Sequence, residues 1–404
     1  MKTLMKQLQW AAETALFTAS VLADAPDVDQ NVDNTGGISV NTQMPNTGDL
    51  GQGASASISA SGAVGSVSIS GNGGGFVYPT DGSVNGFGSV TQTIDNTGTI
   101  SNGTTTPSTI AIGDGSTAGD LGQGAVASIG ATGATASVSV NGNGATALGD
   151  AVNLGAVTQS TTNSGVVTNG DTGGDVNTIT SANLAGDGSA AAISAGGASS
   201  SVGLSFNNSE LDGAGSANNF SVGAVTQTSL NSNQANDGPN VANYGTISLG
   251  THAGDGASAS ISAAGASTSV SLSSINSAWD DNSTPGFAGA TQTATNGATG
   301  STGGITNEGD LSITSGGIAG VGGSASISAS GSIASVGVSS IGASSPSPIA
   351  MADINQTSAN YMAVSNTGTV DLGGGGLAQG AGASAGATGA AASVSFRTIT
   401  PPAP

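Results

Sequence analysis

Apolar and polar residues alternate with a period of two along most of the chain after residue 25. In one clear stretch, Ala54, Ala56, Ile58 and Ala60 share one parity and serines occupy the other. Successive side chains of a β-strand point to opposite faces, so this pattern predicts strands with one apolar and one hydroxyl face. No segment beyond residue 25 shows a helical apolar stripe, and its many glycines and β-branched residues disfavour helix. The pattern therefore predicts an all-β chain.

The same strand pattern recurs six times around a glycine. Two residues before the glycine there is always Ala, four after it Ser and five after it Val. The residue four before it is Ile in five copies and Ala385 in the last. The apolar parity switches at this glycine, which predicts a turn or corner because glycine enters positive φ without steric cost. The predicted turn glycines are Gly62, Gly133, Gly197, Gly265, Gly331 and Gly389.

A second repeated feature is a Gln followed four residues later by an Asn. Residues i and i+4 of a strand share a face, so stacked copies would place amide over amide, where each group satisfies the donors and acceptors of the next. We favour this structural ladder over the alternative, a polar groove that binds a ligand. The predicted ladder residues are Gln30, Asn34, Gln92, Asn96, Gln159, Asn163, Gln227, Asn231, Gln292, Asn296, Gln356 and Asn360.

These two features divide the chain into six modules of about 65 residues. One module cannot bury a thin apolar face alone, but stacked neighbours can. We therefore predict a repetitive β-solenoid (β-helix), with stacked β-hairpin sheets as the alternative. Residues 1–25 have the outline of a signal peptide, and the alternative there is a short N-terminal helix. The predicted repeats are 26–87, 88–154, 155–222, 223–288, 289–352 and 353–396, followed by a Pro-rich tail, 397–404.

Asn-x-Gly-x-aliphatic motifs lie between the two features, as in Asn96-Thr97-Gly98-Thr99-Ile100 and Asn366-Thr367-Gly368-Thr369-Val370. They resemble repeats of secreted bacterial β-helix proteins, namely filamentous haemagglutinin-like adhesins and autotransporter passenger domains. The resemblance implies a secreted or surface-exposed β-solenoid that serves in adhesion or as a scaffold.

Composition excludes several functions. The chain has three basic and 24 acidic residues, no Cys and a net charge of −21. Nucleic-acid binding needs a basic face, and Cys metal sites and disulfides need sulfur. No stretch is long and apolar enough for a transmembrane helix. His252, the only histidine, is interpreted as a polar loop residue, so no Ser-His-Asp set is expected and we predict no enzyme.

Calcium is the one cofactor that the sequence raises. Gly-Asp turns recur near the glycine anchor, at Asp49, Asp120, Asp187 and Asp255, and carboxylates with turn carbonyls are ligands of Ca²⁺. We favour Asp as a turn residue here and otherwise expect no cofactor. Ice binding is a further minor alternative, because Thr-x-Thr occurs in two modules.

The sequence thus predicts a glycine-rich, acidic, secreted or cell-surface structural protein: an adhesin, a fibre, or a biofilm-matrix or surface-layer subunit. The expected partners are further copies of itself, other surface or matrix components, and glycans. The rival function is a β-helix protein that binds or cleaves polysaccharide.

Overall fold

The computed structural model describes most of the repeated part of the chain, and all structural statements concern these residues. They are 15–17, 27–46, 49–72, 85–112, 120–143, 152–171, 176–184, 186–207, 210–211, 221–232, 241–252, 254–275, 278–279, 286–298, 303–313, 317–341, 350–351, 353–372 and 376–399.

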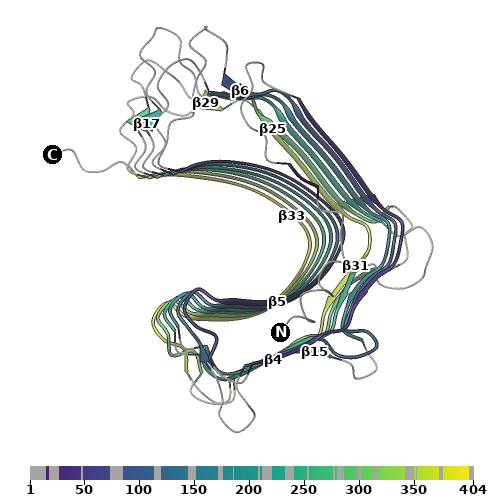
Figure 1. The fold of residues 1–404 in the computed structure, drawn as a ribbon, viewed down its shortest axis with the longest axis vertical. Helices are drawn as coiled ribbons and strands as arrows, with labels where there is room; N and C mark the ends of the chain where they lie inside the picture. Colours follow the sequence, from purple (N-terminus) through teal and green to yellow (C-terminus); the bar gives the residue numbers. More distant parts are fainter. Residues whose placement is uncertain are drawn as a thin grey trace, which may run out of the picture.

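The chain winds through six coils that stack in parallel, so the predicted all-β solenoid is confirmed. Seen along the stack, each coil traces a C (Figure 1). Three outer strands run along the outside of the C, and one 18-residue strand returns along its concave side. Coil one begins at β2, coil two at β7, coil three at β13, coil four at β19, coil five at β25 and coil six at β30.

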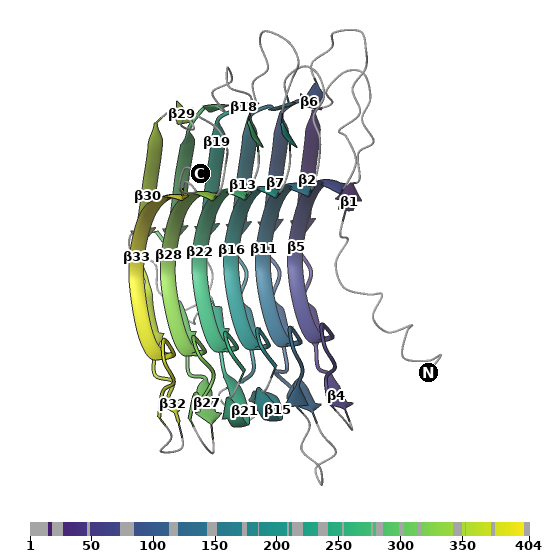
Figure 2. The same ribbon diagram turned by 90° about the vertical axis from the view of Figure 1, so that its left-hand side faces the viewer.

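The long returning strands form the inner sheet, which lines the concave side and is seen edge to edge in Figure 2. Its six long strands are β5 (Ser55–Asn72), β11 (Val126–Asn143), β16 (Ala190–Asn207), β22 (Ser258–Ile275), β28 (Ser324–Ile341) and β33 (Gly382–Ile399). The three-residue strand β1 (Ala15–Phe17) adds to the free edge of β5.

Three outer sheets face the inner sheet. The first contains β2 (Val28–Asn34), β7 (Val90–Asn96), β13 (Val157–Asn163), β19 (Val225–Asn231), β25 (Ala290–Asn296) and β30 (Ile354–Asn360). The second contains β3 (Ile38–Val40), β8 (Ile100–Asn102), β14 (Val167–Asn169), β20 (Val241–Asn243), β26 (Gly304–Asn307) and β31 (Ala363–Asn366). The third contains β4 (Gln43–Asn46), β9 (Thr109–Ile112), β10 (Asp120–Leu121), β15 (Asn177–Leu184), β21 (Gly245–His252), β27 (Asp310–Ile313) and β32 (Val370–Asp371).

Two small sheets complete the stack. One contains β6 (Asn85–Phe87), β12 (Val152–Leu154), β18 (Ser221–Val222), β24 (Gly286–Phe287) and β29 (Ala350–Met351), and the other pairs β17 (Glu210–Leu211) with β23 (Ala278–Trp279). All of these strands pair in parallel, which rules out the hairpin alternative for them.

The core between inner and outer sheets is thin, and its residue sizes are matched across it. In coils one to five, the isoleucine four residues before the glycine anchor packs against aliphatic residues of the third outer sheet. Two residues later, alanines such as Ala131 and Ala195 face Ile100 and Val167 of the second outer sheet. Valines such as Val138 and Val202 pack against the first outer sheet. A few large side chains per coil are enough to fill this core, because equivalent positions of successive coils are stacked in register.

The predicted role of the glycine anchors is wrong. The six predicted turn glycines make no turn: each lies inside an 18-residue strand, and those strands are continuous through it. The parity switch itself is present, since Ala131, Gly133, Ala134 and Ala136 are all buried on one side of β11. The glycine thus allows one long strand to curve and change parity without reversing its direction.

The short N-terminal helix is not supported. Of residues 1–25 the structure describes only 15–17, and these form strand β1. The rest of that segment, with its predicted signal peptide, lies outside the described residues, as do residues 400–404 of the Pro-rich tail. Residues 397–399 continue strand β33.

Candidate functional site

The predicted glutamines form a continuous hydrogen-bonded row through all six coils. Each Nε2 donates to Oε1 of the preceding glutamine: Gln92 to Gln30 at 2.7 Å, Gln159 to Gln92 at 2.8 Å, Gln227 to Gln159 at 2.8 Å, Gln292 to Gln227 at 2.9 Å and Gln356 to Gln292 at 2.8 Å. The same nitrogen also donates across the core to a backbone carbonyl of the inner sheet, as from Gln227 to Ser269 at 3.0 Å. The glutamines therefore tie the first outer sheet to the inner sheet.

The predicted asparagines form a second continuous row with the opposite donor direction. Each Nδ2 donates to Oδ1 of the following asparagine: Asn34 to Asn96 at 2.6 Å, Asn96 to Asn163 at 2.7 Å, Asn163 to Asn231 at 2.8 Å, Asn231 to Asn296 at 2.8 Å and Asn296 to Asn360 at 2.7 Å. Several also donate to a carbonyl two residues on, as Asn163 does to Gly165. Glutamine donors thus point toward coil one, and asparagine donors toward coil six.

The glycine anchors are required by this asparagine row. A Cβ at Gly133 would lie 2.3 Å from Oδ1 of Asn163, and one at Gly197 would lie 2.4 Å from Oδ1 of Asn231. In each case the asparagine belongs to the next coil. A Cβ at Gly197 would also come within 2.5 Å of the carbonyl oxygen of Gly265. Each glycine makes room for the coil that follows it, which is a different use of glycine from the predicted turn.

A third amide row, in the second outer sheet, was missed by the sequence analysis. Asn169 donates to Asn243 at 2.9 Å and Asn307 to Asn366 at 3.4 Å, and these side chains also donate to inner-sheet carbonyls. This row is incomplete, because Oδ1 of Asn307 has no partner among the described residues. The Asn-x-Gly-x-aliphatic motif could have revealed it: the motifs at Asn34, Asn96 and Asn163 follow the first outer sheet, whereas those at Asn243, Asn307 and Asn366 follow the second.

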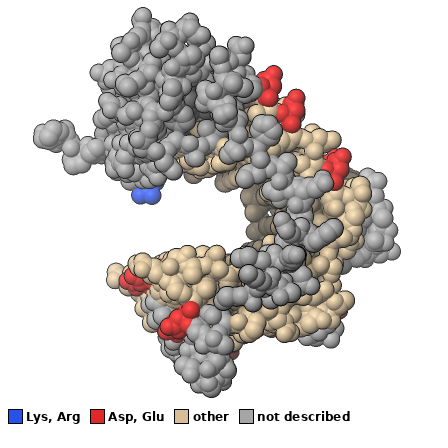
Figure 3. All heavy atoms as spheres, viewed as in Figure 1, with Lys and Arg blue, Asp and Glu red and all other residues tan. Residues whose placement is uncertain are grey.

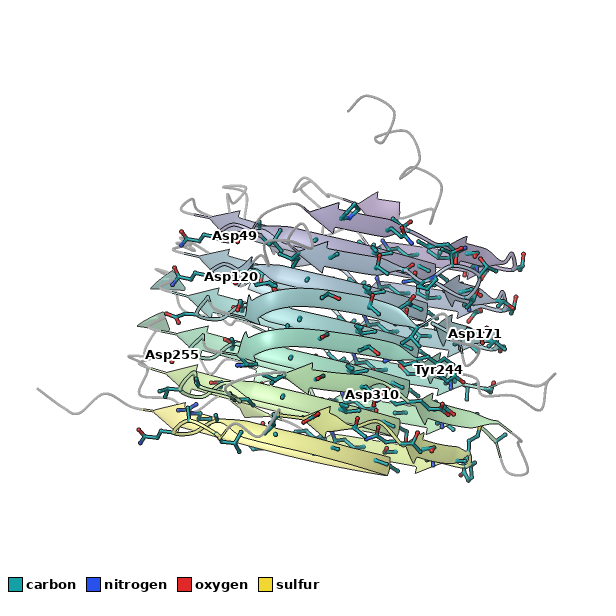
Figure 4. All side chains as sticks on the ribbon, turned by 90° about the horizontal axis from the view of Figure 1, so that it is seen from below. Asp49, Asp120, Asp171, Tyr244, Asp255 and Asp310 are labelled. Atoms are coloured by element: carbon teal, nitrogen blue, oxygen red, sulfur yellow. The ribbon has the colours of Figure 1, made fainter. Side chains whose placement is uncertain are left out.

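The four calcium candidates lie in two separate rows. Oδ1 of Asp49 accepts the amide N–H of Asp120 at 3.0 Å, and Oδ1 of Asp187 accepts that of Asp255 at 3.0 Å. Asp49, Asp120 and Asp255 lie along the same side of the stack (Figure 4). Among the described residues no three carboxylate or histidine side chains converge in a way that could hold a metal ion. These aspartates instead brace the turns of adjacent coils, since a carboxylate accepts a backbone N–H readily.

His252 is not a loop residue. It ends β21 and is buried in the row formed by Leu50, Leu121, Leu184, Ile318 and Leu377. Nε2 lies 3.2 Å from the carbonyl oxygen of Ser324, and Nδ1 has no partner among the described residues. Burial lowers the pKa of this imidazole, because the low-dielectric core disfavours the charged form. The side chain fills an aliphatic position, and the alternation alone could have placed it there.

The concave face of the inner sheet is a hydroxyl surface. The serine four residues after each glycine anchor repeats in all six coils and points away from the core. These serines are Ser66, Ser137, Ser201, Ser269, Ser335 and Ser393. Figure 3 shows the molecule hollowed on this side, with the visible acidic groups toward the rims and the outer wall. Such rows repeat at the strand spacing of about 4.8 Å.

The face of coil six is open and apolar. Val394 is 44% exposed, although Val336, the equivalent residue of coil five, is 2% exposed. Leu377 and Phe396 are exposed as well, yet they continue rows that are buried in inner coils. The whole of β33 is one uncovered strand edge, seen at the left of Figure 2. An uncovered strand edge presents unpaired backbone donors and acceptors to a further chain.

No protein-family model, curated protein or solved structure matches this chain. Within the described part of the chain there is no helix of the length and apolarity needed to cross a membrane.

Proposed function

We propose that the protein is a secreted or cell-surface structural protein, in which stacked coils form a rigid rod for a fibre, an adhesin stalk or an extracellular matrix. The observation that supports this most directly is the pair of amide rows. They run without interruption through all six coils and are buried at the four inner ones. Hydrogen bonds along the axis join every coil to the next, which is how stacked β-structures resist being pulled apart.

The charge distribution supports a role outside the cell. The net charge of −21 belongs almost wholly to the repeats, and none of the described aspartates is buried. A strongly negative rod stays soluble and repels lateral neighbours. The resemblance of Asn96–Ile100 to secreted bacterial β-helix repeats points the same way. Between Lys6 and Arg397 the chain contains no Lys or Arg, so Arg397 near the end of β33 is the one trypsin site in the described part of the stack.

Location and form can be tested together. Antibodies raised against the purified protein should label unpermeabilised producing cells, and electron microscopy should show rods or filaments that survive trypsin. Label confined to the interior of permeabilised cells would contradict the proposal.

A second candidate, polysaccharide binding, is favoured by the serine rows of the concave face. A periodic, uncharged hydroxyl surface can bind a periodic sugar chain through hydrogen bonds. Retention of the protein on insoluble glycans would support this function, with Ser201→Val and Ser269→Val together as the variant expected to lose it. Retention unchanged by those substitutions would argue against the concave face.

A further inference from the structure

The two ends of the stack carry equivalent residues at equivalent places. Several rows that form the core and the amide ladders end in coil six with a side chain similar to the one that begins them in coil one. Ile354, Gln356, Asn360, Leu377 and Val394 correspond to Val28, Gln30, Asn34, Leu50 and Val67. Coil one of another copy would therefore continue these five rows of coil six without a change of residue type.

The hydrogen-bonding groups left over at the two ends are complementary. At coil six, Oε1 of Gln356 has no donor among the described residues, and Nδ2 of Asn360 uses one proton, on the carbonyl of Met362. At coil one, Nε2 of Gln30 uses one proton, on the carbonyl of Ser66, and Oδ1 of Asn34 has no donor among the described residues. Coil six thus offers a glutamine acceptor and an asparagine donor, and coil one the reverse.

Gly389 indicates which partner coil six accommodates. In the inner coils the anchor glycine is needed because the asparagine and the anchor-glycine carbonyl of the next coil lie against it. Coil six has no next coil in its own chain, and a Cβ at Gly389 would meet only Nδ2 of Asn360, at an ordinary 3.6 Å. Alanine would fit there, yet coil six keeps the glycine, and with it the space that an asparagine such as Asn34 would fill.

We propose that coil six of one chain docks in register onto coil one of a second copy, head to tail, extending both amide rows and the inner sheet across the junction. This inference rests on the proposed structural function and names the partner and the contact. A face-to-face pairing of two sixth coils would oppose acceptor to acceptor at Gln356. Head-to-tail contact is heterologous and does not close, so it produces a filament.

Just before the first outer sheet the junction would place Asp353 beside Asp27 of the docking copy, but within that sheet charge does not oppose it. Asp29 and Asp33 of coil one continue rows that end in coil six at Asn355 and Ala359, which are neutral. The carboxylates would therefore meet no like charge in those rows.

Strand β1 partly occupies the same edge. Its residues 15–17 pair with residues 65–67 of β5, and in the junction residues 392–394 of the chain that contributes coil six would take that place. Docking therefore requires β1 to leave the edge. The N-terminal segment competes with assembly, and its release would speed filament growth.

The decisive variant is Gly389→Ala in the full chain. The new methyl group has room in the single chain but would meet Asn34 and the Gly62 carbonyl of the docking copy. We expect the pelletable, filamentous fraction to fall at least about tenfold, with the circular dichroism spectrum and melting temperature unchanged. Gly386→Ala is the matched control: it lies on the same strand, a Cβ there meets nothing within 4 Å, and it should assemble normally.

Three further measurements complete the test. Val394→Lys should also block assembly, because the junction would bury an unpaired ammonium, whereas Val126→Lys, at an exposed valine of coil two, should not. The Gly389→Ala chain keeps an intact coil one, so it should still add to the coil-six end of a wild-type filament. Its own coil six then blocks further addition, so traces of it should shorten the filaments. Leu16→Pro should disfavour pairing of β1 and shorten the lag before assembly.

Normal filaments from both Gly389→Ala and Val394→Lys would overturn this junction and leave the proposed structural function intact, with assembly through another surface. Failure of both the wild-type and the Leu16→Pro chains to assemble would overturn it too. The location of the protein on cells is measured separately and would decide the proposed function by itself.

Discussion

Coils three and six contain nearly the same residues in very different surroundings. In coil three, Gln159, Ile193 and Val202 are at most 1% exposed. Their counterparts in coil six are Gln356, Ala385 and Val394, and all three are at least partly exposed. Gly197 of coil three has no room for a methyl group, and Gly389 of coil six does. The environment of a residue in this stack is therefore set largely by the coil that follows it.

The largest effect should come from placing a methyl group at an inner glycine. Gly197→Ala would force Asn231 and the Gly265 carbonyl away, breaking the asparagine row and the inner sheet together. We expect a loss of about 3 kcal/mol or more in the free energy of unfolding. Gly389→Ala should change it by less than about 0.5 kcal/mol. Denaturant unfolding of both variants at low protein concentration measures the difference, and equal losses would refute the comparison.

The amide rows should show the same contrast more weakly. Gln227→Leu removes the two hydrogen bonds that Gln227 donates. It leaves Oε1 of Gln159 without its donor and Nε2 of Gln292 without its glutamine acceptor. Unsatisfied buried groups cost about 1–3 kcal/mol each, so we expect a loss of about 3 kcal/mol. Gln356→Leu should lose about 1 kcal/mol, because water replaces the lost partners. Denaturant unfolding measures both losses. Equal losses of unfolding free energy for the two variants would mean that a buried glutamine of the row stabilises the fold no more than the glutamine at its end.

Much of this contrast follows from the sequence, and part does not. The alternation around Ile58 predicts the strands, and the six-fold recurrence of Gln and Asn predicts the stack. The glycine anchors were misread because glycine serves equally for positive φ and for close approach, and only the neighbouring coil distinguishes the two. Asn163 and Asn243 carry the same motif at different corners, and loop lengths that vary between coils conceal this. The exposure of coil six could not be predicted, because its residues resemble those of the inner coils and differ only in having no following coil to cover them.

His252 provides a smaller test within a single row, between the buried Leu121 and the exposed Leu377. Because the folded state lowers the pKa of this imidazole, the unfolded chain binds a proton first as pH falls. Stability should therefore decrease from about pH 6.5 downward, until the lower folded-state pKa is reached. His252→Leu should remove this dependence and add about 1 kcal/mol, since a buried nitrogen without a partner is lost. Melting temperatures at pH 5 and pH 7.5 check it; an unchanged pH slope would contradict the assignment.

The smallest expected effect restores the missing isoleucine of coil six. Ala385→Ile would cover Ile327 on one side only, so we expect a gain of about 0.5 kcal/mol, against a loss of about 3 kcal/mol for Ile261→Ala in coil four. A thermal melt of the two variants side by side makes the measurement. A gain as large as the Ile261 loss would show that coil six is already covered on its outer side.

The opposed donor directions of the two continuous amide rows have an electrical consequence. Aligned peptide units give an α-helix a macrodipole, with partial charges at its two ends. Here the glutamine amides point one way along the axis and the asparagine amides the other, one of each per coil. Their dipoles largely cancel within every coil, so lengthening the rod accumulates little potential from these two rows at either tip. The stack can grow by whole coils, or by whole chains, without an electrostatic penalty from the hydrogen bonds that join them.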